Sequence, residues 1–232
     1  MSDNNSSVSV ELPEYMKKIH HWAYLNPTMV SFLNNIMIVY LKSFFYAGKL
    51  AKLAANEVNP KDAVLQMGTT YGDQIYAIAD KVGDDGFFDI IDISKIQLKK
   101  WKDQLGAYPQ TQVYNLDAEN TPPTDRKYDV VLSFFLLHEL PDPKKTRVID
   151  NMLNCLKNDP HAKAVFIDFS NPAKMNPLKY LIKPFAFLYS PFTESLFEKD
   201  ISSFASNADD YIWRKETFLG GVYQKTIAMK KP

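Results

Sequence analysis

The sequence of 232 residues has little glycine, almost no cysteine and no excess of either charge. Its single cysteine, Cys155, excludes a disulfide framework and an all-cysteine zinc site. The 27 basic and 27 acidic side chains cancel, which excludes general electrostatic binding to nucleic acid, because that needs a strongly basic face. Only eight glycines occur, so each is expected where the backbone requires one.

Long apolar runs are also missing. The most apolar stretch, residues 29–47, is interrupted by Asn34, Asn35 and Lys42, and its apolar residues repeat at helical spacing. A transmembrane helix needs about 20 nearly uninterrupted apolar residues, so this stretch is predicted not to span a membrane. The polar first eleven residues contain no arginine and do not resemble a secretory signal or a transit peptide.

What the chain does contain is an alternation of strand-like and helix-like segments. The strand-like segments are residues 63–67, 86–92, 112–117, 128–137, 164–168, 212–219 and 223–229. Helix-like segments lie between them at residues 72–82, 96–105 and 146–156. This alternation predicts an α/β fold with a mostly parallel sheet, and Gly220-Gly221 predicts that the last two strands form an antiparallel hairpin.

The predicted organisation has three parts. Residues 1–12 are expected to be a disordered tail, and residues 13–60 to form N-terminal helices that serve as a lid. Residues 61–232 form the main domain, with an insert at about 171–205 before the hairpin.

Ligands of such sheets bind beyond the carboxyl ends of the strands. There, residues 66–72 follow the first strand and open a helix, and Gly68 and Gly72 allow a ligand close to the backbone. Asp92 ends the second strand, where a carboxylate can accept both hydroxyl protons of a ribose. The alternative is an ordinary turn beside a surface aspartate.

Five stretches resemble a known family: residues 22–27, residues 64–66 together with 71–73, and residues 89–93, 134–141 and 213–225. They resemble class I S-adenosylmethionine-dependent methyltransferases, more closely the ubiquinone and menaquinone C-methyltransferases, and most closely the rhodoquinone biosynthesis (RquA) family. The resemblance implies a Rossmann-like class I methyltransferase fold with seven strands. It also implies replacement of a methoxy group of ubiquinone by an amino group, with S-adenosylmethionine as amino donor and Mn²⁺ as a required metal.

The same resemblance implies peripheral attachment to an inner membrane and quinone-biosynthesis proteins as possible partners. Its cofactor-binding residues would be Gln66, Gly68, Thr70, Tyr71, Gly72, Asp92, Ile93, Asp117, Ala118 and Phe134. Asp117 would contact the adenine amino group, which suits a carboxylate acceptor. Tyr24 would be a catalytic residue of the lid, or would simply pack at a helix end.

The first motif departs from the methyltransferase pattern at two positions. Gln66 replaces an acid, and Thr70 replaces the middle glycine. In the family that acid holds the methionine amino group, and a carboxylate favours its ammonium form. Our hypothesis is that neutral Gln66 helps to leave a nucleophilic free amine. The alternative is that Gln66 is a hydrogen-bonding substitute without a chemical role.

His138 and Glu139 end the fourth strand, and Asp168 ends the fifth. Imidazole and carboxylate groups suit a first-row divalent ion, so these three residues are predicted to bind Mn²⁺, with His138 and Glu139 also catalytic. In the alternatives His138 or Glu139 transfers protons, or Glu139 caps the next helix while His138 packs.

Residues 171–193 carry three lysines and no acid, interleaved with aromatic and aliphatic residues. Such a segment is predicted to lie on a membrane or to line the quinone tail, and the alternative is a core helix with a loop. Two other functions stay open: a conventional quinone C-methyltransferase, and a non-catalytic scaffold of a quinone-biosynthesis complex.

Overall fold

The computed structural model describes residues 46–69, 73–121, 124–189 and 191–232, without the side chains of residues 185–189. The predicted tail at 1–12 and most of the predicted helices at 13–60 therefore lie outside the described residues. So do Tyr24, Thr70, Tyr71 and Gly72.

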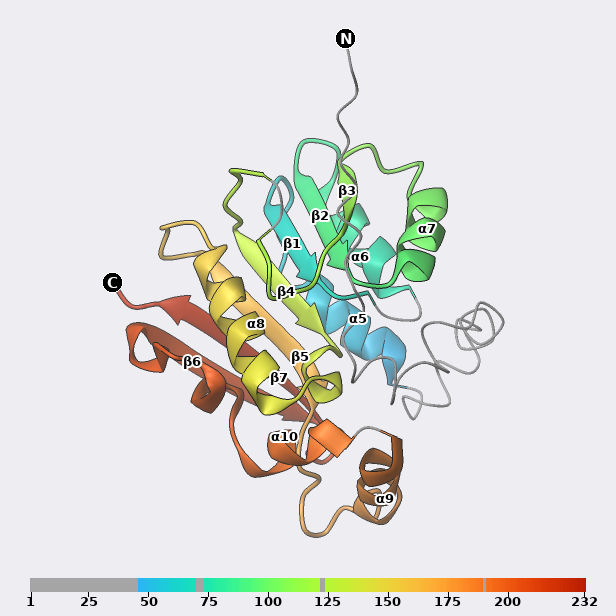
Figure 1. Cartoon of the computed structure of the whole chain (residues 1–232), viewed down its shortest axis with the longest axis vertical. Coiled ribbons are helices and arrows are strands. Elements are labelled where there is room, and N and C mark those ends of the chain that lie inside the picture. The colour runs from blue at the N-terminus through green and yellow to red at the C-terminus, as the bar shows by residue number, and fades with distance from the viewer. Residues whose placement is uncertain (1–45, 70–72, 122–123, 190) are drawn as a thin grey trace.

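A seven-stranded sheet forms the centre of the molecule, in the order β3-β2-β1-β4-β5-β7-β6 (Figure 1). The strands are β1 (Ala63–Met67), β2 (Phe87–Asp92), β3 (Thr111–Asn115), β4 (Val130–Phe134), β5 (Lys163–Phe169), β6 (Tyr211–Phe218) and β7 (Tyr223–Lys230). The first five run parallel, and β7 pairs antiparallel with both β5 and β6. The predicted fold class, with its C-terminal hairpin, is confirmed.

Helices cover both faces of this sheet. The main ones are α5 (Ala47–Ala55), α6 (Gln74–Val82), α7 (Lys95–Gln104), α8 (Asp142–Asn154), α9 (Lys179–Tyr189) and α10 (Glu194–Glu198). Leu50, Ile75 and Trp101, from α5, α6 and α7, share one buried core. Val148 and Met152 of α8 belong to the core on the other face. The short 3-10 turns are η1 (Leu137–Glu139), η2 (Pro191–Thr193), η3 (Ile201–Phe204) and η4 (Ala208–Asp210).

After residue 60, two boundaries differ from the sequence expectation by three or more residues. The fourth strand ends at Phe134 rather than at residue 137, because Phe135 has a positive φ of 54° and turns the chain into η1. Helix α8 begins at Asp142 rather than at residue 146, because Pro143 lies in its first turn, where a missing N–H costs nothing.

The hairpin turn between β6 and β7 holds the start of the insert. Asn176 Nδ2 donates to the carbonyls of Leu219 and Gly220 at 2.9 and 3.0 Å. Gly221 has a φ of 89°, and a Cβ there would lie 2.9 Å from the carbonyl oxygen of Asn171. Only glycine therefore fits at this contact.

Gly221→Ala is expected to lower the free energy of unfolding by about 1–3 kcal/mol, because both the positive φ and the backbone contact oppose a Cβ. Urea denaturation measures the change. Gly106→Ala is the matched control, since a Cβ there meets nothing closer than 3.9 Å and should be neutral or stabilising. Equal losses of unfolding free energy in the two variants would contradict the requirement for glycine at position 221.

Glu57, just after α5, links the helical layer to the sheet. Its carboxylate accepts hydrogen bonds from Lys163 at 2.8 Å and Lys225 at 2.7 Å. Burial raises the pKa of Glu57, but the two lysines outweigh it, so the pKa lies below its usual value of 4.5. The stabilisation is then present above pH 4.5 and lost as the pH falls through the folded-state pKa.

Glu57→Gln should therefore lower the free energy of unfolding at pH 7 by about 1–2 kcal/mol. The curves of wild type and variant, measured by denaturation from pH 7 downward, should converge at acid pH. The exposed pair of Lys61 and Asp85 provides the control, because Asp85→Asn should change stability little at any pH. If the difference in unfolding free energy between wild type and Glu57→Gln stays constant with pH, the role of the Glu57 charge is refuted.

None of the helices in the described ranges combines the length and the apolar character needed to cross a membrane.

Candidate functional site

A pocket lies at the carboxyl ends of the parallel strands β1 to β4, where the topology predicts a ligand site. Its volume is about 610 Å³, including the part open to solvent. Of the predicted site residues, the pocket walls contain Gly68, Asp92, Ile93, Asp117, Ala118 and Glu139. The other lining residues were not predicted from the sequence: Thr69, Ile91, Leu116, Phe135, Leu136 and Leu140.

Gly68 opens the turn after β1 with a φ of 80°. Its N–H donates to the carbonyl of Ile91 at 2.8 Å, and a Cβ would lie 3.2 Å from Leu136 Cδ1. The glycine thus keeps the backbone close to the pocket, as predicted from its place after the strand.

Gln66 is fully buried in β1 and forms a reciprocal pair with Gln74 of α6. Gln66 Nε2 donates to Gln74 Oε1 at 3.1 Å and to the Gly68 carbonyl at 3.1 Å, and Gln74 Nε2 donates to Gln66 Oε1 at 3.0 Å. The position that the resemblance assigns to an acid is therefore neutral and hydrogen-bonded, two residues before Gly68 opens the pocket turn.

Asp92 ends β2 and faces the pocket. Its Oδ2 accepts from the N–H and hydroxyl of Thr69 at 2.7 and 2.5 Å, and Oδ1 accepts from Ser94 N–H at 2.6 Å. Burial raises the pKa of Asp92, and these hydrogen bonds partly offset that rise. One acceptor position of Oδ1 is left for a ligand hydroxyl.

Asp117 and Ala118 lie just beyond β3 and form the opposite wall of the pocket. Helix α8 holds them: Lys144 Nζ lies 3.2 Å from Asp117 Oδ2, and Asn151 Nδ2 donates to the Ala118 carbonyl at 2.8 Å. Lys144 also pairs with Glu119. Side chains of α8, which lies far away in the sequence, hold this loop in position. The local sequence of the loop did not predict these contacts.

Phe134 was predicted to bind cofactor, but its side chain is buried in the core, and Phe135 lines the pocket instead. The positive φ of Phe135 is uncommon for a bulky residue and is typical of functional sites. Its ring contacts His138, Phe169 and Tyr223 at centroid distances of 5.9, 5.2 and 5.6 Å. An aromatic cluster thus adjoins the pocket, and the sequence showed only the abundance of aromatic residues.

His138 and Glu139 lie in η1, and Asp168 lies at the end of β5. His138 Nδ1 is 2.9 Å from Asp168 Oδ1, and His138 Nε2 is 3.9 Å from Glu139 Oε1. Burial lowers the pKa of His138, but the charge and hydrogen bond of Asp168, with the charge of Glu139, raise it overall. The three predicted residues do come together. Asp168 holds the His138 imidazole in place, and the two carboxylates favour its protonated form.

The same three residues do not fit a shared metal site. Asp168 also accepts the N–H groups of Leu137, His138 and Phe169, at 2.9, 3.3 and 2.7 Å. With His138 these donors occupy its acceptor positions, because η1 folds its first N–H groups onto the carboxylate. Among the described residues, no three His, Cys, Asp or Glu side chains gather as metal ligands. In the described residues the Asp168 carboxylate instead holds η1 and orients His138, and its role as a metal ligand stays a prediction.

The N-cap of α8 is Pro141, whose side chain makes no capping hydrogen bond, and Glu139 lines the pocket. His138 does pack, edge-on against Phe169 at a centroid distance of 4.9 Å.

Residues 64–159 match a family model described as a methyltransferase domain. This part of the chain is therefore similar to methyltransferase domains. The chain is also similar to the ubiquinone/menaquinone biosynthesis C-methyltransferase UbiE of Vibrio campbellii, at 26% identity over 171 residues. That alignment covers 72% of this chain and 61% of the relative. A demethylmenaquinone methyltransferase of Bacillus licheniformis is 28% identical over 146 residues, covering 63% and 58%.

Solved methyltransferase structures share the fold of this chain. The mitomycin 7-O-methyltransferase MmcR matches with a TM-score of 0.67 at 13% identity, covering 91% of this chain and 60% of that one. Human N-acetylserotonin methyltransferase, in complex with S-adenosylmethionine, matches with a TM-score of 0.63 at 14% identity, covering 95% and 61%. At such identities the likeness shows the Rossmann-like class I fold alone, which confirms the predicted fold.

Proposed function

We propose that this chain is an enzyme that uses S-adenosylmethionine to modify the ring of a quinone. The observation that carries the proposal is the pocket that joins Gly68, Asp92 and Asp117 at the carboxyl ends of the parallel strands, within the residues that match a methyltransferase domain. Asp92 would accept a hydrogen bond from a ribose hydroxyl, and Asp117 would accept one from the adenine amino group. The relatives named as quinone C-methyltransferases support a quinone as substrate.

We further propose that the transferred group is an amine, so that ubiquinone becomes rhodoquinone. The Gln66–Gln74 pair supports this, because no carboxylate at that position favours an ammonium on the cofactor. The neutral nitrogen attacks the ring carbon that bears the methoxy group, so that a C–N bond forms while the C–O bond breaks and methanol leaves. The Cα proton of the cofactor then moves to the ring, which takes up two electrons to become the quinol, and the nitrogen becomes an imine. Water hydrolyses this imine to the aminoquinol, the reduced form of rhodoquinone, and the 2-oxo acid of the cofactor. His138, oriented by Asp168, would transfer the proton to the departing methoxy oxygen.

The second candidate is a conventional C-methyl transfer, which the names of the relatives favour. The third is a scaffold without catalysis, for which the two altered motif positions would be expected. Mn²⁺ stays a prediction of the resemblance, and no step is assigned to it, since the described residues do not form its site.

One incubation separates these functions. The protein is mixed with ubiquinone and S-adenosylmethionine labelled at its amino nitrogen, with and without Mn²⁺, and the quinone is analysed by mass spectrometry. Labelled nitrogen with loss of one methoxy group supports amination. An added methyl group with both methoxy groups retained supports C-methylation. Absence of product, with cofactor binding seen by calorimetry, supports the scaffold.

A further inference from the structure

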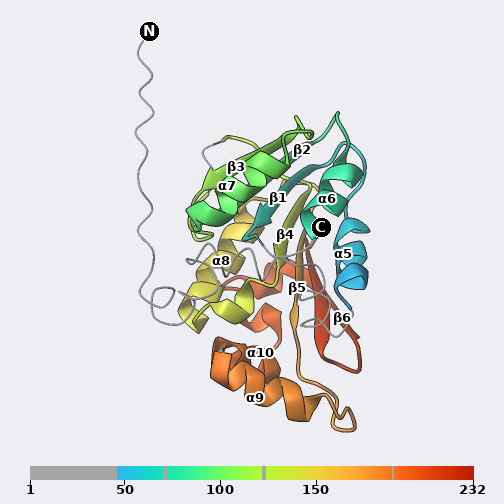
Figure 2. The same cartoon turned by 90° about the vertical axis from the view of Figure 1, so that its right-hand side faces the viewer.

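The insert between β5 and β6 exposes apolar side chains in one place. Met175, Tyr180 and Leu181 are 93%, 76% and 58% exposed, and they are three of the five large hydrophobic side chains exposed in the described part of the chain. The other two, Phe87 and Ile212, lie on β2 and β6. In two perpendicular views α9 lies at the lower end of the molecule, beyond α10 (Figure 1, Figure 2).

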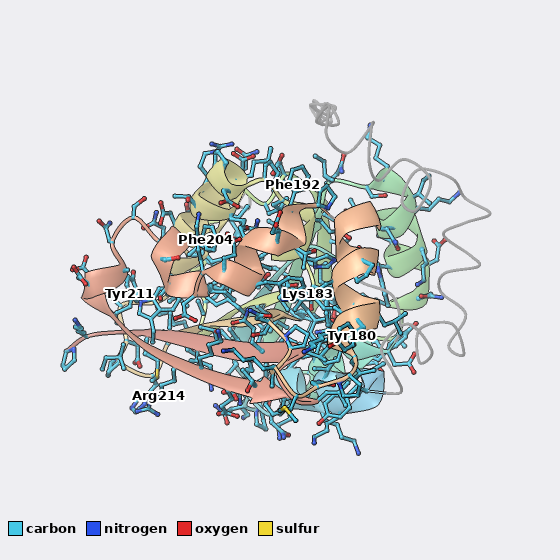
Figure 3. The ribbon with its side chains drawn as sticks, turned by 90° about the horizontal axis from the view of Figure 1, so that it is seen from below. Tyr180, Lys183, Phe192, Phe204, Tyr211 and Arg214 are labelled. Atoms are coloured by element: carbon cyan, nitrogen blue, oxygen red, sulfur yellow. The ribbon has the colours of Figure 1, made fainter. Side chains whose placement is uncertain are left out.

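This surface is also basic. Lys174 and Lys183 are exposed, and Lys179 Nζ lies 4.8 Å from the centre of the Tyr180 ring. Tyr180 and Lys183 both come from α9 (Figure 3). Residues 169–193 contain no Asp or Glu, so no acid within the segment neutralises the lysines.

The opposite side of the same segment is anchored. Ile182 is 4% exposed and belongs to the core, and Asn176 is hydrogen-bonded to the hairpin turn. The inner side of the segment therefore belongs to the core, and it holds the exposed residues outward. Apolar and aromatic side chains flanked by lysines are the chemistry of an interfacial segment on an anionic bilayer.

We propose that Lys174, Met175, Tyr180, Leu181 and Lys183 form a docking surface for an anionic lipid bilayer. The lysines attract the negative surface, and the apolar side chains enter the headgroup region. This is a peripheral attachment, and it does not depend on the chemistry proposed above.

The docking surface is joined to the η1 turn through buried contacts. Lys145 of α8 has a fully buried side chain, whose Nζ donates to the Phe192 carbonyl and to Ser195 Oγ, both at 2.7 Å. Phe192 lies in η2, which packs against η1. Docking would therefore fix how the His138 side of the molecule is oriented relative to the bilayer. In the proposed function, the lipid-soluble quinone would reach the site from that bilayer.

Flotation of the full chain with vesicles tests this surface. Wild type is expected to float with vesicles of phosphatidylcholine and phosphatidylglycerol, more weakly at high salt, and not with phosphatidylcholine alone. The double variant Lys174→Gln/Lys183→Gln should lose roughly 30-fold in partitioning, from the usual contribution of a lysine near an anionic surface. Tyr180→Ser/Leu181→Ser should also reduce binding by about 10-fold or more.

Ile212→Ser is the matched control, because it removes an exposed apolar side chain from β6 and should float like wild type. Thermal unfolding checks that all variants are folded. The proposal is overturned if wild type does not bind anionic vesicles. It is also overturned if both double variants bind as well as wild type, since another surface would then be responsible.

Discussion

Asp168→Asn should reduce turnover about 100-fold or more while leaving the cofactor affinity nearly unchanged. The carboxylate orients the His138 imidazole through the 2.9 Å contact and favours its protonated form. A positioned general acid or base contributes roughly 10²–10⁴-fold to a rate, and the amide supplies neither the charge nor a second acceptor oxygen. Turnover of ubiquinone and calorimetric binding of S-adenosylmethionine measure the two effects separately.

The same variant should also lower the free energy of unfolding by about 1–3 kcal/mol, because Asp168 accepts backbone N–H groups of η1. Asp129→Asn provides the control. Its carboxylate likewise accepts a backbone N–H, from Ala63 at 2.8 Å, but it lies before β4, at the other end of the strands. The control should lose stability and keep activity. A similar loss of activity in both variants would mean that Asp168 acts on activity only through the stability of the fold.

In the proposed amination, Gln66→Glu should abolish most of the nitrogen transfer while tightening the binding of S-adenosylmethionine. A carboxylate near the cofactor amine raises the pKa of that amine by roughly 1–3 units, which lowers the free-amine fraction about 10- to 1,000-fold. The same charge attracts the ammonium and improves affinity. Labelled-nitrogen transfer and calorimetry measure the two results, which should move in opposite directions.

Gln66→Met separates charge from hydrogen bonding. It breaks the pair with Gln74 but leaves the position neutral, so amination should persist even though the protein is less stable. Loss of amination in both variants would mean that the hydrogen-bonded pair itself matters. Full activity of Gln66→Glu would contradict the free-amine hypothesis.

The pattern of residues was sufficient for the fold because each strand carries its own signal. The run at 63–67 is apolar and bounded by turn residues, and it became β1 without change. Gly220-Gly221 likewise gave the hairpin, since positive φ angles at both residues are open to glycine. The end of β4 could not be predicted, because the positive φ of Phe135 depends on the packing of its ring against Phe169 and Tyr223.

The site was only partly visible in the sequence. Gly68, Asp92 and Asp117 follow strand ends, and parallel strands bring their carboxyl ends to one edge, so their meeting in the pocket was predictable. The partners of these residues were not. Lys144 reaches Asp117 from a helix 27 positions later, and such contacts between distant segments leave no local pattern.

The sequence by itself determined the order of strands and helices, the neutral residue at position 66 and the basic, acid-free insert, because these are properties of composition and spacing. Only the tertiary structure decided what Asp168 does. Seen alone, its carboxylate was as suitable for a metal as for a hydrogen bond. The fold places η1 over it, and backbone N–H groups removed from water must find an acceptor. Asp168 therefore accepts hydrogen bonds from the backbone of η1 and orients the His138 imidazole, which lies beside the pocket.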